Sequence, residues 1–388
     1  MKILHICMSQ YSDGWTYQEN LLAKYHRLLG FDVTIITSMY CYHNGDLIKD
    51  SKTKFVDCNG CQVIRLQKKI GIPNGKIPKY KNFYKTIESI KPDIIFSHGC
   101  QYADICKVKK YINLYQNVKL YVDNHADFSN SATTWISKNI LHKVIWKHYA
   151  HVIEPVVKVF WGVLPARVDF LVNVYKLPKE KCKLLLMGGD DELIRSVEST
   201  EYLDKLRKSW NIQKNDFLVV TGGKIDKAKS ETLLLMKAVK KINDPHVKLL
   251  IFGSVEETLK KEINGLTDGV MIQQAGWIKP ENSYGFFGMA DLVVFPGRHS
   301  VFWEQVAAQG IPMIVKEWRG TQHVNVCNNV IFLSDVTSDM IIKKITDLVY
   351  NKKAYQEIRK NAKRAQEYFS YMQIAKKSIE IIDSKNVL

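Results

Sequence analysis

The sequence predicts an α/β protein in which two doubly wound parallel sheets form two Rossmann-like domains. Short runs of apolar residues recur along the chain without polar alternation, which is typical of strands buried on both faces. Longer helical stretches separate many of these runs, as helices do in parallel sheets. The chain has 388 residues, which is enough for two domains that each have a core.

Apolar runs in the first half of the chain are expected to form strands. They are Ile3–Met8, Asp32–Thr37, Val63–Leu66, Asp93–Ser97, Val118–Asp123, Val152–Glu154 and Leu184–Met187. Helical stretches fall between several of them, such as Tyr17–Leu29 and Lys79–Ile90. The first run contains His5 and lacks a small-residue cleavage site, so it predicts a strand and not a signal peptide.

The second half repeats the pattern and predicts a second domain. Its expected strands are Phe217–Thr221, Val247–Phe252, Val270–Gln273, Asp291–Phe295, Pro312–Val315 and Val330–Leu333. The small polar stretch from Met187 to Asp191 predicts the break between the domains. We therefore expect a first domain over 1–190, a second over 191–370, and a C-terminal helix over 371–388 that could return to the first domain.

Composition bounds the class of protein. Apolar residues make up 46% and charged residues 24% of the chain, as in globular proteins, and no run of about 18 apolar residues predicts a spanning helix. The eight cysteines are scattered, and the pair Cys58 and Cys61 has no second pair to complete a zinc site. Reduced thiols in a cytoplasmic protein without a metal are the expectation.

The net charge of +17 is uneven along the chain. Residues 1–190 contain 27 Lys and Arg against 15 Asp and Glu, which gives +12. No nucleic-acid module is recognisable, and basic residues alternate with aromatic and aliphatic ones, as between Lys138 and Lys147. This pattern favours an anionic membrane surface or phosphorylated substrates, with an ordinary basic surface as the alternative.

Candidate site residues follow the expected strands, because open α/β sheets bind ligands at the carboxyl ends of their strands. Gly14 follows the first strand and could let the backbone approach an anion, or it could form a tight turn. His125 follows the strand that ends at Asp123 and is flanked by two carboxylates, Asp123 and Asp127. It could bind a ligand or have a structural role.

The second domain carries a cluster of lysines after its first strand. Lys224 and Lys229 lie with two glycines before a helix, where lysine opposes the helix dipole, so the cluster predicts an anion such as a phosphate. A solvated charged loop is the alternative.

Two further loops of the second domain carry candidate residues. Glu304 lies in the first turn of an apolar helix, just after Arg298, His299 and Ser300. Its carboxylate could accept hydrogen bonds from the two hydroxyls of a ribose, as in dinucleotide folds. Trp277 and Ile278 follow Gly276 and could border a base, or they could be core residues.

In order and spacing, these segments resemble the GT-B glycosyltransferases of family 4, the large retaining group, over nearly the whole chain. The resemblance rests on Gly14, Gly30–Ile36, Lys91–His98, the hinge-like Lys183–Asp190, Gly223–Lys229 and Glu304–Pro312. Gly223–Lys229 is similar to the Gly-Arg-x-x-x-x-Lys phosphate motif, with Lys224 in place of Arg. Glu304–Pro312 is similar to Glu-Ala-x-Ala-x-Gly-x-Pro.

The resemblance implies the GT-B fold, with two Rossmann-like domains facing across a cleft, and a role for each candidate. Glu304 would bind the ribose of a nucleotide-sugar, Lys224 and Lys229 would neutralise its diphosphate, and Gly14 would lie against the phosphates. His125 would touch the transferred sugar, and Trp277 and Ile278 would border the base. The family usually has a second glutamate eight residues before the ribose glutamate, where this sequence has Pro296. Arg298, His299 and Ser300 occupy that region instead.

The implied function is metal-independent retaining transfer of a sugar from a nucleotide-diphospho-sugar, here expected to be a UDP-sugar. The acceptor would be a glycan or a lipid-linked glycan of cell-surface polysaccharide synthesis, and the protein would be cytoplasmic, peripheral at the inner face of the membrane. A GT-B-fold nucleotide-sugar epimerase and a non-catalytic nucleotide-sugar-binding protein remain alternatives. The sequence lacks Gly-x-Gly-x-x-Gly after the first strand, which argues against a dinucleotide-dependent oxidoreductase.

Overall fold

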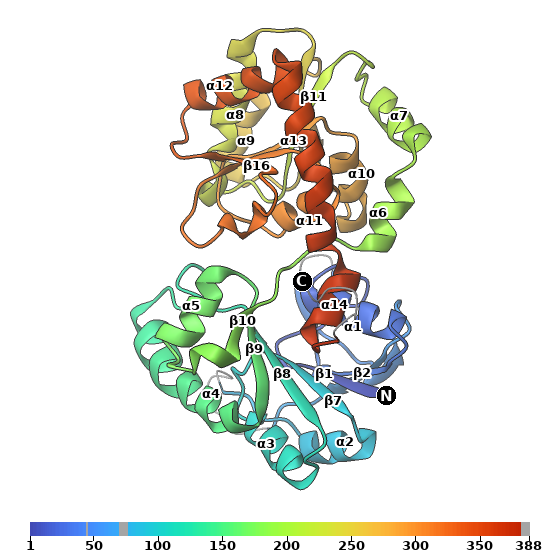
Figure 1. Cartoon of the computed structure of the whole chain (residues 1–388), viewed down its shortest axis with the longest axis vertical. Coiled ribbons are helices and arrows are strands. Elements are labelled where there is room, and N and C mark those ends of the chain that lie inside the picture. Colours follow the sequence, from blue (N-terminus) through green and yellow to red (C-terminus); the bar gives the residue numbers. More distant parts are fainter. Residues whose placement is uncertain (44–45, 70–76, 382–388) are drawn as a thin grey trace. The chain divides into compact units, whose positions relative to one another are not determined.

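The computed structural model describes residues 1–43, 46–69 and 77–381, and it divides the chain into two compact units. Unit 1 comprises Met1–Leu186 and Ile374–Leu388, and unit 2 comprises Met187–Gln373 (Figure 1). The division lies four residues before the expected one at 190. Residues 371–373 belong to unit 2, and residues 382–388 of the expected C-terminal helix lie outside the described residues.

Unit 1 is built on one mainly parallel sheet with the order β10-β9-β8-β7-β1-β2-β6-β5, in which only β5 runs antiparallel to its neighbour. The strands are β1 (Lys2–Cys7), β2 (Asp32–Ser38), β5 (Lys54–Val56), β6 (Gln62–Leu66), β7 (Ile94–His98), β8 (Lys119–Asn124), β9 (Val157–Gly162) and β10 (Cys182–Leu184). A separate antiparallel hairpin consists of β3 (Tyr40–His43) and β4 (Asp46–Lys49).

Helices cover both faces of this sheet. One face packs against α2 (Phe83–Ile90), α3 (Ile105–Leu114), α4 (Lys147–Ile153) and α5 (Pro165–Asn173). The other face meets α1 (Gln18–Leu28) and the end of α14 (Tyr371–Ser378), whose backbone accepts a hydrogen bond from the Trp161 indole. A π-helix, η2 (Ser137–Trp146), leads into α4, and short 3₁₀ turns are η3 (Glu154–Val156) and η4 (Lys179–Lys181).

Unit 2 contains a second, wholly parallel sheet with the order β13-β12-β11-β14-β15-β16. Its strands are β11 (Phe217–Gly222), β12 (Val247–Phe252), β13 (Ile272–Gly276), β14 (Leu292–Phe295), β15 (Met313–Lys316) and β16 (Val330–Leu333). From β11 the chain winds to one side through β12 and β13, and from β14 to the other side. The direction of winding therefore changes between β11 and β14.

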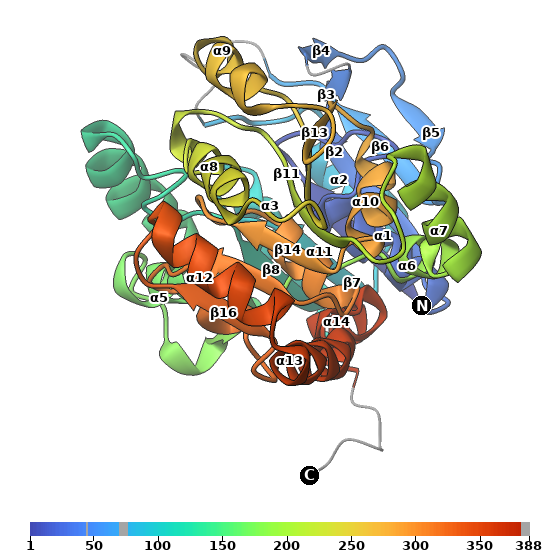
Figure 2. The ribbon, with the colours of Figure 1, turned by 90° about the horizontal axis from the view of Figure 1, so that it is seen from above.

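One face of the second sheet packs against α8 (Thr232–Ile242), α9 (Glu257–Leu266), α12 (Ser338–Val349) and α13 (Lys352–Ala365), and α8 and α12 lie side by side (Figure 2). The other face meets α10 (Ser283–Gly288) and α11 (Phe302–Ala308) through aromatic rings, including Phe252 against Phe287 and Phe295 against Trp303. The remaining elements are α6 (Asp191–Val197), α7 (Thr200–Ser209), η5 (Lys227–Lys229), η6 (Pro280–Asn282), η7 (Gln322–Val324) and η8 (Gln366–Phe369).

The predicted fold class, two doubly wound parallel α/β units, is confirmed. Two expected strands are wrong. Val152–Glu154 lies at the end of α4 and in η3, and the strand of that region is β9, a few residues later; Leu184–Met187 shares only Leu184 with β10, which ends there. The run at Val152–Glu154 is short and mostly apolar, which favours a strand, but Ile153 packs as a helical residue into the unit 1 core. The hairpin β3–β4 and the edge strand β5 were not predicted.

The core of unit 1 includes a buried imidazole that the fold keeps neutral. His142 of η2 contacts the Tyr175 hydroxyl through Nδ1 at 2.8 Å and the Ser131 hydroxyl through Nε2 at 2.9 Å. Burial lowers the pKa of His142 to about 4. The pKa of His26, on α1, is also about 4, again chiefly because of burial.

These two histidines predict a loss of stability in mild acid. Their pKa values are about 4 in the folded state and about 6.5 in an unfolded chain, so the unfolded state binds more protons between these values. The unfolding free energy should therefore fall as the pH is lowered from about 6.5 to 4, by up to ~1.4 kcal/mol per pH unit for each histidine. His142→Gln should flatten this slope in denaturant titrations at several pH values. An unchanged slope in a folded His142→Gln variant would contradict this assignment.

Candidate active site

The best-defined candidate site lies in unit 2, at the point where the direction of winding changes. Open α/β sheets bind ligands in the crevice at the carboxyl ends of the strands at such a point. Here the loops that follow β11 and β14 surround a small hollow, which is lined by Thr221, Gly222, Lys224, Ile225, Lys229, Thr232, Phe295, Pro296, Gly297 and Arg298. Lys224, Lys229 and Arg298, three of the predicted site residues, thus lie at one hollow.

The two loops approach each other closely at Gly297, and the first of them is also held against the end of β12 at Gly223. A Cβ at Gly297 would lie 3.1 Å from Lys229 Cα. Gly223 has a φ of 112°, and its N–H donates to the carbonyl of Phe252 at the end of the neighbouring strand. These close contacts lie at the carboxyl end of the sheet, and the hollow between the loops is small.

Basic groups give the hollow its electrostatic character. Burial lowers the pKa of Lys229, Asp226 opposes this shift, and the nearby charge of Arg298 adds to it. Lys224 is more exposed, with 70% of its side chain accessible, and its Nζ lies 3.8 Å from Asp226 Oδ2. Because nearby cations weaken one another's protonation and an anion restores it, the hollow is suited to a bound anion.

Glu304, in the first turn of α11, is completely buried. Its Oε1 accepts from His299 Nε2 at 2.9 Å and from His323 Nε2 at 2.7 Å. Burial alone would raise the pKa of this carboxyl, but the two histidines outweigh burial and hold the pKa well below its usual range. Glu304 is therefore an anion in the folded protein.

Several polar atoms around Glu304 have no hydrogen-bond partner among the described residues. They are Glu304 Oε2, Ser300 Oγ, Trp303 Nε1 and His323 Nδ1, and all four are buried. Buried polar groups are almost always paired, so a group of such atoms indicates a place for a ligand or ordered water. His323, from η7, was not identified from the sequence, because it lies 19 residues beyond Glu304 and carries no motif.

Trp277 and Ile278 follow β13, at the edge of the unit 2 sheet, and do not line the small hollow. The Trp277 ring is mostly exposed, with 69% of the residue accessible, and Ile278 is partly buried. Exposure of a large indole is consistent with a flat binding partner but does not require one.

In unit 1, Gly14 lies in an exposed turn with a φ of 76° that precedes α1. His125 follows β8, and its Nε2 lies 3.3 Å from Asp123 Oδ2. Burial lowers the pKa of His125, but the charge of Asp123 outweighs burial, so the net shift is upward. Asp127, the second flanking carboxylate, instead pairs with Arg167. The structure therefore assigns one of the two acids to His125.

A second histidine, which was not singled out from the sequence, shares Asp123. His98, the last residue of β7, contacts the same Oδ2 through Nδ1 at 2.8 Å. Burial alone would raise the pKa of Asp123, but His125 and His98 hold it well below its usual range. His98 could have been identified from its position, because it lies at the carboxyl end of β7, and the direction of winding in this sheet changes between β1 and β7.

Within the described residues, two groups have the residue types of a metal site: His98, Asp123 and His125, and His299, Glu304 and His323. Two nitrogen or oxygen ligands on one tetrahedral zinc ion lie about 3.3 Å apart, given zinc–ligand distances of about 2.0–2.1 Å. The contacts of 2.8 Å in the first group and 2.7 Å in the second are hydrogen-bond distances. In both groups the histidines and the carboxylate are therefore joined by hydrogen bonds.

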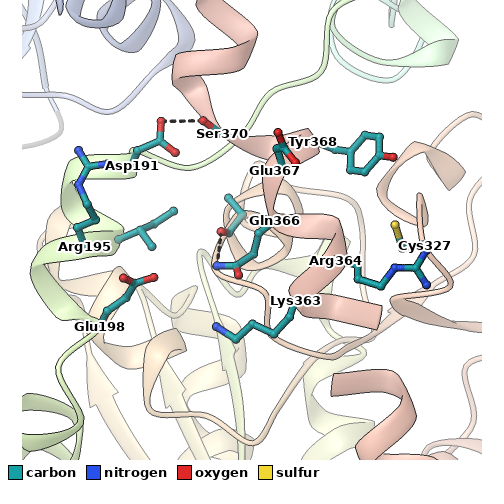
Figure 3. A pocket seen from close by; sticks show the side chains of 12 residues that line it. Asp191, Arg195, Glu198, Cys327, Lys363, Arg364, Gln366, Glu367, Tyr368 and Ser370 are labelled. Atoms are coloured by element: carbon teal, nitrogen blue, oxygen red, sulfur yellow. Dashed lines mark hydrogen bonds between the residues drawn. The ribbon is translucent and has the colours of Figure 1, made fainter. Parts of the chain in front are cut away.

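A larger hollow of about 660 Å³ lies elsewhere in unit 2, among α6, α13 and η8 (Figure 3). Side chains of both signs line it, including Arg195, Glu198 and Lys363. None of the residues predicted from the sequence lines it, and its charges oppose one another, so it does not define a ligand class.

Comparison with known proteins agrees with this geometry. Residues 202–365 match the family model described as Glycosyl transferases group 1. No curated protein sequence matches the chain significantly.

Among solved structures, the chain is similar to a glycosyltransferase from Rickettsia africae ESF-5, with 16% identity, coverage of 98% of this chain and 97% of that one, and a TM-score of 0.69. It is also similar to Anabaena HepE in complex with UDP, with 15% identity, coverage of 98% and 99%, and a TM-score of 0.71. A third similar structure is UDP-GlcNAc 2-epimerase from Neisseria meningitidis bound to UDP-GlcNAc, with 12% identity, coverage of 98% and 99%, and a TM-score of 0.62. The chain therefore has the GT-B fold, and its residues 202–365 are similar to the glycosyl transferases group 1 family.

Proposed function

We propose that this protein is a retaining glycosyltransferase that uses a nucleotide-diphospho-sugar, most simply a UDP-sugar, and needs no metal ion. The observation that carries the proposal is the pair of loops after β11 and β14. They combine an anion-suited hollow at Lys224, Lys229 and Arg298 with the buried Glu304, whose Oε2 has no partner among the described residues. A nucleoside diphosphate has the matching groups, a diphosphate and the hydroxyls of a ribose.

The role of each side chain follows from its surroundings. Glu304 Oε1 is held by two histidines, so Oε2 is the atom that would accept a ribose hydroxyl. Lys229, Lys224 and Arg298 would oppose the charge that grows on the diphosphate as the bond from the sugar C1 to its oxygen breaks. Ser300 and Trp303 would donate to the same ligand.

The transfer step needs few protein groups. The acceptor hydroxyl attacks C1 from the face that the diphosphate leaves, its proton passes to the departing phosphate oxygen, and the new glycosidic bond keeps the original configuration. We further propose that His125 contacts the transferred sugar, that Gly14 contacts the phosphates, and that Trp277 and Ile278 contact the base. We assign the acceptor, a glycan or a lipid-linked glycan of cell-surface polysaccharide synthesis, to unit 1.

A membrane acceptor is supported by a surface of unit 1. In and just before η2, Trp135, Ile136, Ile140 and Val144 are exposed, at 70%, 55%, 42% and 60%. The exposed Lys138 and Lys143 lie among them, while His142 and Trp146 on the buried side enter the core. Exposed apolar and aromatic side chains beside lysines are typical of helices that lie in a membrane interface. None of the helices formed by the described residues has the length and apolar character that a membrane span requires.

One observation supports the alternative function of a nucleotide-sugar epimerase. Unit 1 places His98 and Asp123 beside His125, which gives this region more acid–base groups than the sequence suggested. Incubation of a UDP-sugar with the protein alone, followed by nuclear magnetic resonance of the sugar, separates the two functions. An epimeric UDP-sugar would favour the epimerase, and an unchanged configuration favours the transferase.

The ribose and diphosphate roles predict opposite selectivity for two variants. Glu304→Gln should weaken binding of both UDP and uridine at least about tenfold, because a charge-assisted hydrogen bond contributes about 1.5–3 kcal/mol. Lys229→Ala should weaken binding of UDP and leave uridine binding unchanged, because uridine has no phosphate. Isothermal titration calorimetry measures all four affinities.

Each variant serves as the control for the other in this experiment. Circular dichroism establishes that both remain folded, since Glu304→Gln also weakens the contacts with His299 and His323. Wild-type affinity of folded Glu304→Gln for uridine would remove the ribose role, and wild-type affinity of Lys229→Ala for UDP would place the diphosphate elsewhere.

Turnover should depend on Lys229 more than on Lys224. Lys229→Ala should lower kcat by about 10² or more, because oriented charges act on the transition state. Lys224→Ala should cost less, because Lys224 is more exposed and water screens its charge. UDP release from a UDP-sugar, with a panel of glycans as acceptors and a chelator present, measures both effects. Equal wild-type rates for both variants, or inhibition of the wild type by the chelator, would contradict the corresponding part of the proposal.

Membrane binding should be electrostatic and located at η2. The protein should sediment with anionic vesicles, remain in solution with neutral ones and be released by high salt, because each lysine near an anionic surface contributes about 1 kcal/mol. Lys138→Glu/Lys143→Glu should abolish sedimentation. The matched control is Lys343→Glu/Lys353→Glu, which makes the same change of net charge at exposed lysines of unit 2. An equal loss of sedimentation in both double variants, or equal binding of the protein to anionic and neutral vesicles, would contradict a docking role for η2.

A further inference from the structure

A chain of hydrogen-bonded side chains crosses the interior of unit 1 beneath α1 and α14. It begins at Asp123 on β8, whose register partner on β7 is His98. His98 Nε2 lies 3.0 Å from His5 Nδ1 on β1, and His5 Nε2 lies 2.9 Å from His26 Nδ1 on α1. We call Asp123, His98, His5 and His26 the histidine chain.

The chain is shielded from water except at one end. Asp123, His5 and His26 are completely buried, and the side chain of His98 is 5% accessible. His125, which shares Oδ2 of Asp123, is 40% accessible and connects the chain to the surface. The hydrogen-bond partners of the buried rings are therefore protein groups and not bulk water.

The end of the chain at α14 fixes the proton on His26. His26 Nε2 lies 3.1 Å from the carbonyl oxygen of Ala375 and 2.9 Å from Ser378 Oγ. The Ser378 hydroxyl itself donates to the same carbonyl at 2.8 Å. A backbone carbonyl only accepts hydrogen bonds, so His26 carries its proton on Nε2.

This proton position determines the next two rings. Burial lowers the pKa of His26 to about 4 and, with the neighbouring His26 and His98, lowers that of His5 well below its usual value, so both rings are neutral. A neutral ring with its proton on Nε2 accepts at Nδ1. His26 therefore accepts from His5 Nε2, and His5 accepts from His98 Nε2. His98 must carry a proton on Nε2.

The other nitrogen of His98 faces an anion and needs a proton as well. His98 Nδ1 lies 2.8 Å from Oδ2 of Asp123, and the same oxygen lies 3.3 Å from His125 Nε2, so Asp123 is the ionised acceptor of both contacts. A nitrogen lone pair at this distance from a carboxylate would be repelled. His98 therefore carries protons on both nitrogens.

The groups packed around His98 and Asp123 do not change the number of protons assigned to His98. Burial raises the pKa of Cys7 well above its usual value and that of Cys100 to about 12, so both thiols are neutral near Asp123. Glu19 and Arg167 act on His125 with opposite signs. The Phe96 ring packs against His5 and His98 and carries no charge.

We propose that His98 is held as a buried imidazolium, paired with Asp123, and that this ion pair positions His125. The hydrogen bonds of the histidine chain impose this charge. The carbonyl acceptor at α14 fixes the tautomers of His26 and His5, so the three rings donate one bond each toward α14. The fourth bond, from His98 to Asp123, then requires one proton more than three neutral rings carry. Asp123 anchors His125 Nε2 and leaves Nδ1 as its other hydrogen-bonding atom. Use of His125 in sugar transfer rests on the proposed function, but the charge of His98 does not.

The alternative arrangement has one proton fewer, and it reverses the bonds between the rings and the bond between His26 and Ser378, while His98 Nδ1 donates to Asp123 in both. If the Ser378 hydroxyl donated to His26 Nε2, each ring would point its Nδ1 proton toward Asp123 and all three would be neutral. The carbonyl of Ala375 would then face a nitrogen lone pair at 3.1 Å. Ser378→Ala separates the two arrangements, because it removes the only hydroxyl that could donate to His26 Nε2 among the described residues.

The experiment is a long-range ¹H–¹⁵N correlation spectrum of the whole protein with ¹⁵N-labelled histidine, recorded at pH 8. Both His98 nitrogens should be protonated, and His5 and His26 should be protonated at Nε2 only. His142 is the internal reference for a buried neutral ring, since its partners are hydroxyls. Single His→Gln variants assign the signals. A neutral His98, or Nδ1 protons on His5 and His26, would overturn the proposal.

Two carboxylate variants test the positioning of His125. Asp123→Asn should remove one proton from His98 and shift the titration midpoint of His125 downward. Asp127→Asn is the matched control, because Asp127 pairs with Arg167, and it should leave the His98 signals unchanged. Ser378→Ala should leave all tautomers unchanged, which keeps the test decisive if Asp123→Asn fails to fold. Loss of the His98 proton in Asp127→Asn, or a reversal of tautomers in Ser378→Ala, would contradict the inference.

These readouts need no substrate, so they remain valid if the protein is not a glycosyltransferase. If it is one, the pH profile of kcat in Asp123→Asn should move in the same direction as the titration midpoint of His125. Catalysis with an unchanged profile, together with a shifted midpoint, would confine the ion pair to a structural role and contradict positioning for transfer.

Discussion

A carboxylate removed from water must have charged or N–H partners, and in each unit of this chain one carboxylate meets this requirement in the same way. Asp123 and Glu304 are completely buried, and each has one oxygen that contacts two histidines. Without these partners, burying either charge would cost several kcal/mol. The histidines therefore fix how β7 lies against β8 in unit 1 and how α11 lies against η7 in unit 2, and the loops with the candidate ligand groups depend on these two arrangements.

Topology explains why these clusters occur where they do. In both sheets the winding changes direction between adjacent strands, β1 and β7 in unit 1 and β11 and β14 in unit 2. Loops diverge from such a point and leave room for polar side chains that a continuous layer of helices would cover. His98 and the hollow beside Lys229 both lie there, so the same geometric rule locates the chemistry in each unit.

Sequence patterns predicted the parallel sheets well, because apolar runs such as Val247–Phe252 and Val330–Leu333 are strands with those same limits. They failed at Val152–Glu154, where a short apolar run cannot distinguish a strand from the end of a helix. Glu304 and Lys229 were identified because they lie in local motifs. His5, His26, His98 and His323 were missed because their partners are 19 to 352 residues away in the sequence, and spacing alone does not reveal such contacts.

The two clusters differ in what they leave unpaired, and this difference separates their functions. Around Glu304 four buried polar atoms have no partner among the described residues, so this cluster has hydrogen-bonding capacity left for a ligand or ordered water. Within the part of the chain that the structure describes, every ring nitrogen of His98, His5 and His26 has a partner, and of the Asp123 oxygens only Oδ1 has none. Ligand binding should therefore complete the hydrogen bonding of the unit 2 cluster, whereas the unit 1 cluster is already assembled in the free protein. A preassembled ion pair can hold His125 in one orientation before any substrate arrives, which is the condition under which a positioned group lowers the cost of reaching the transition state.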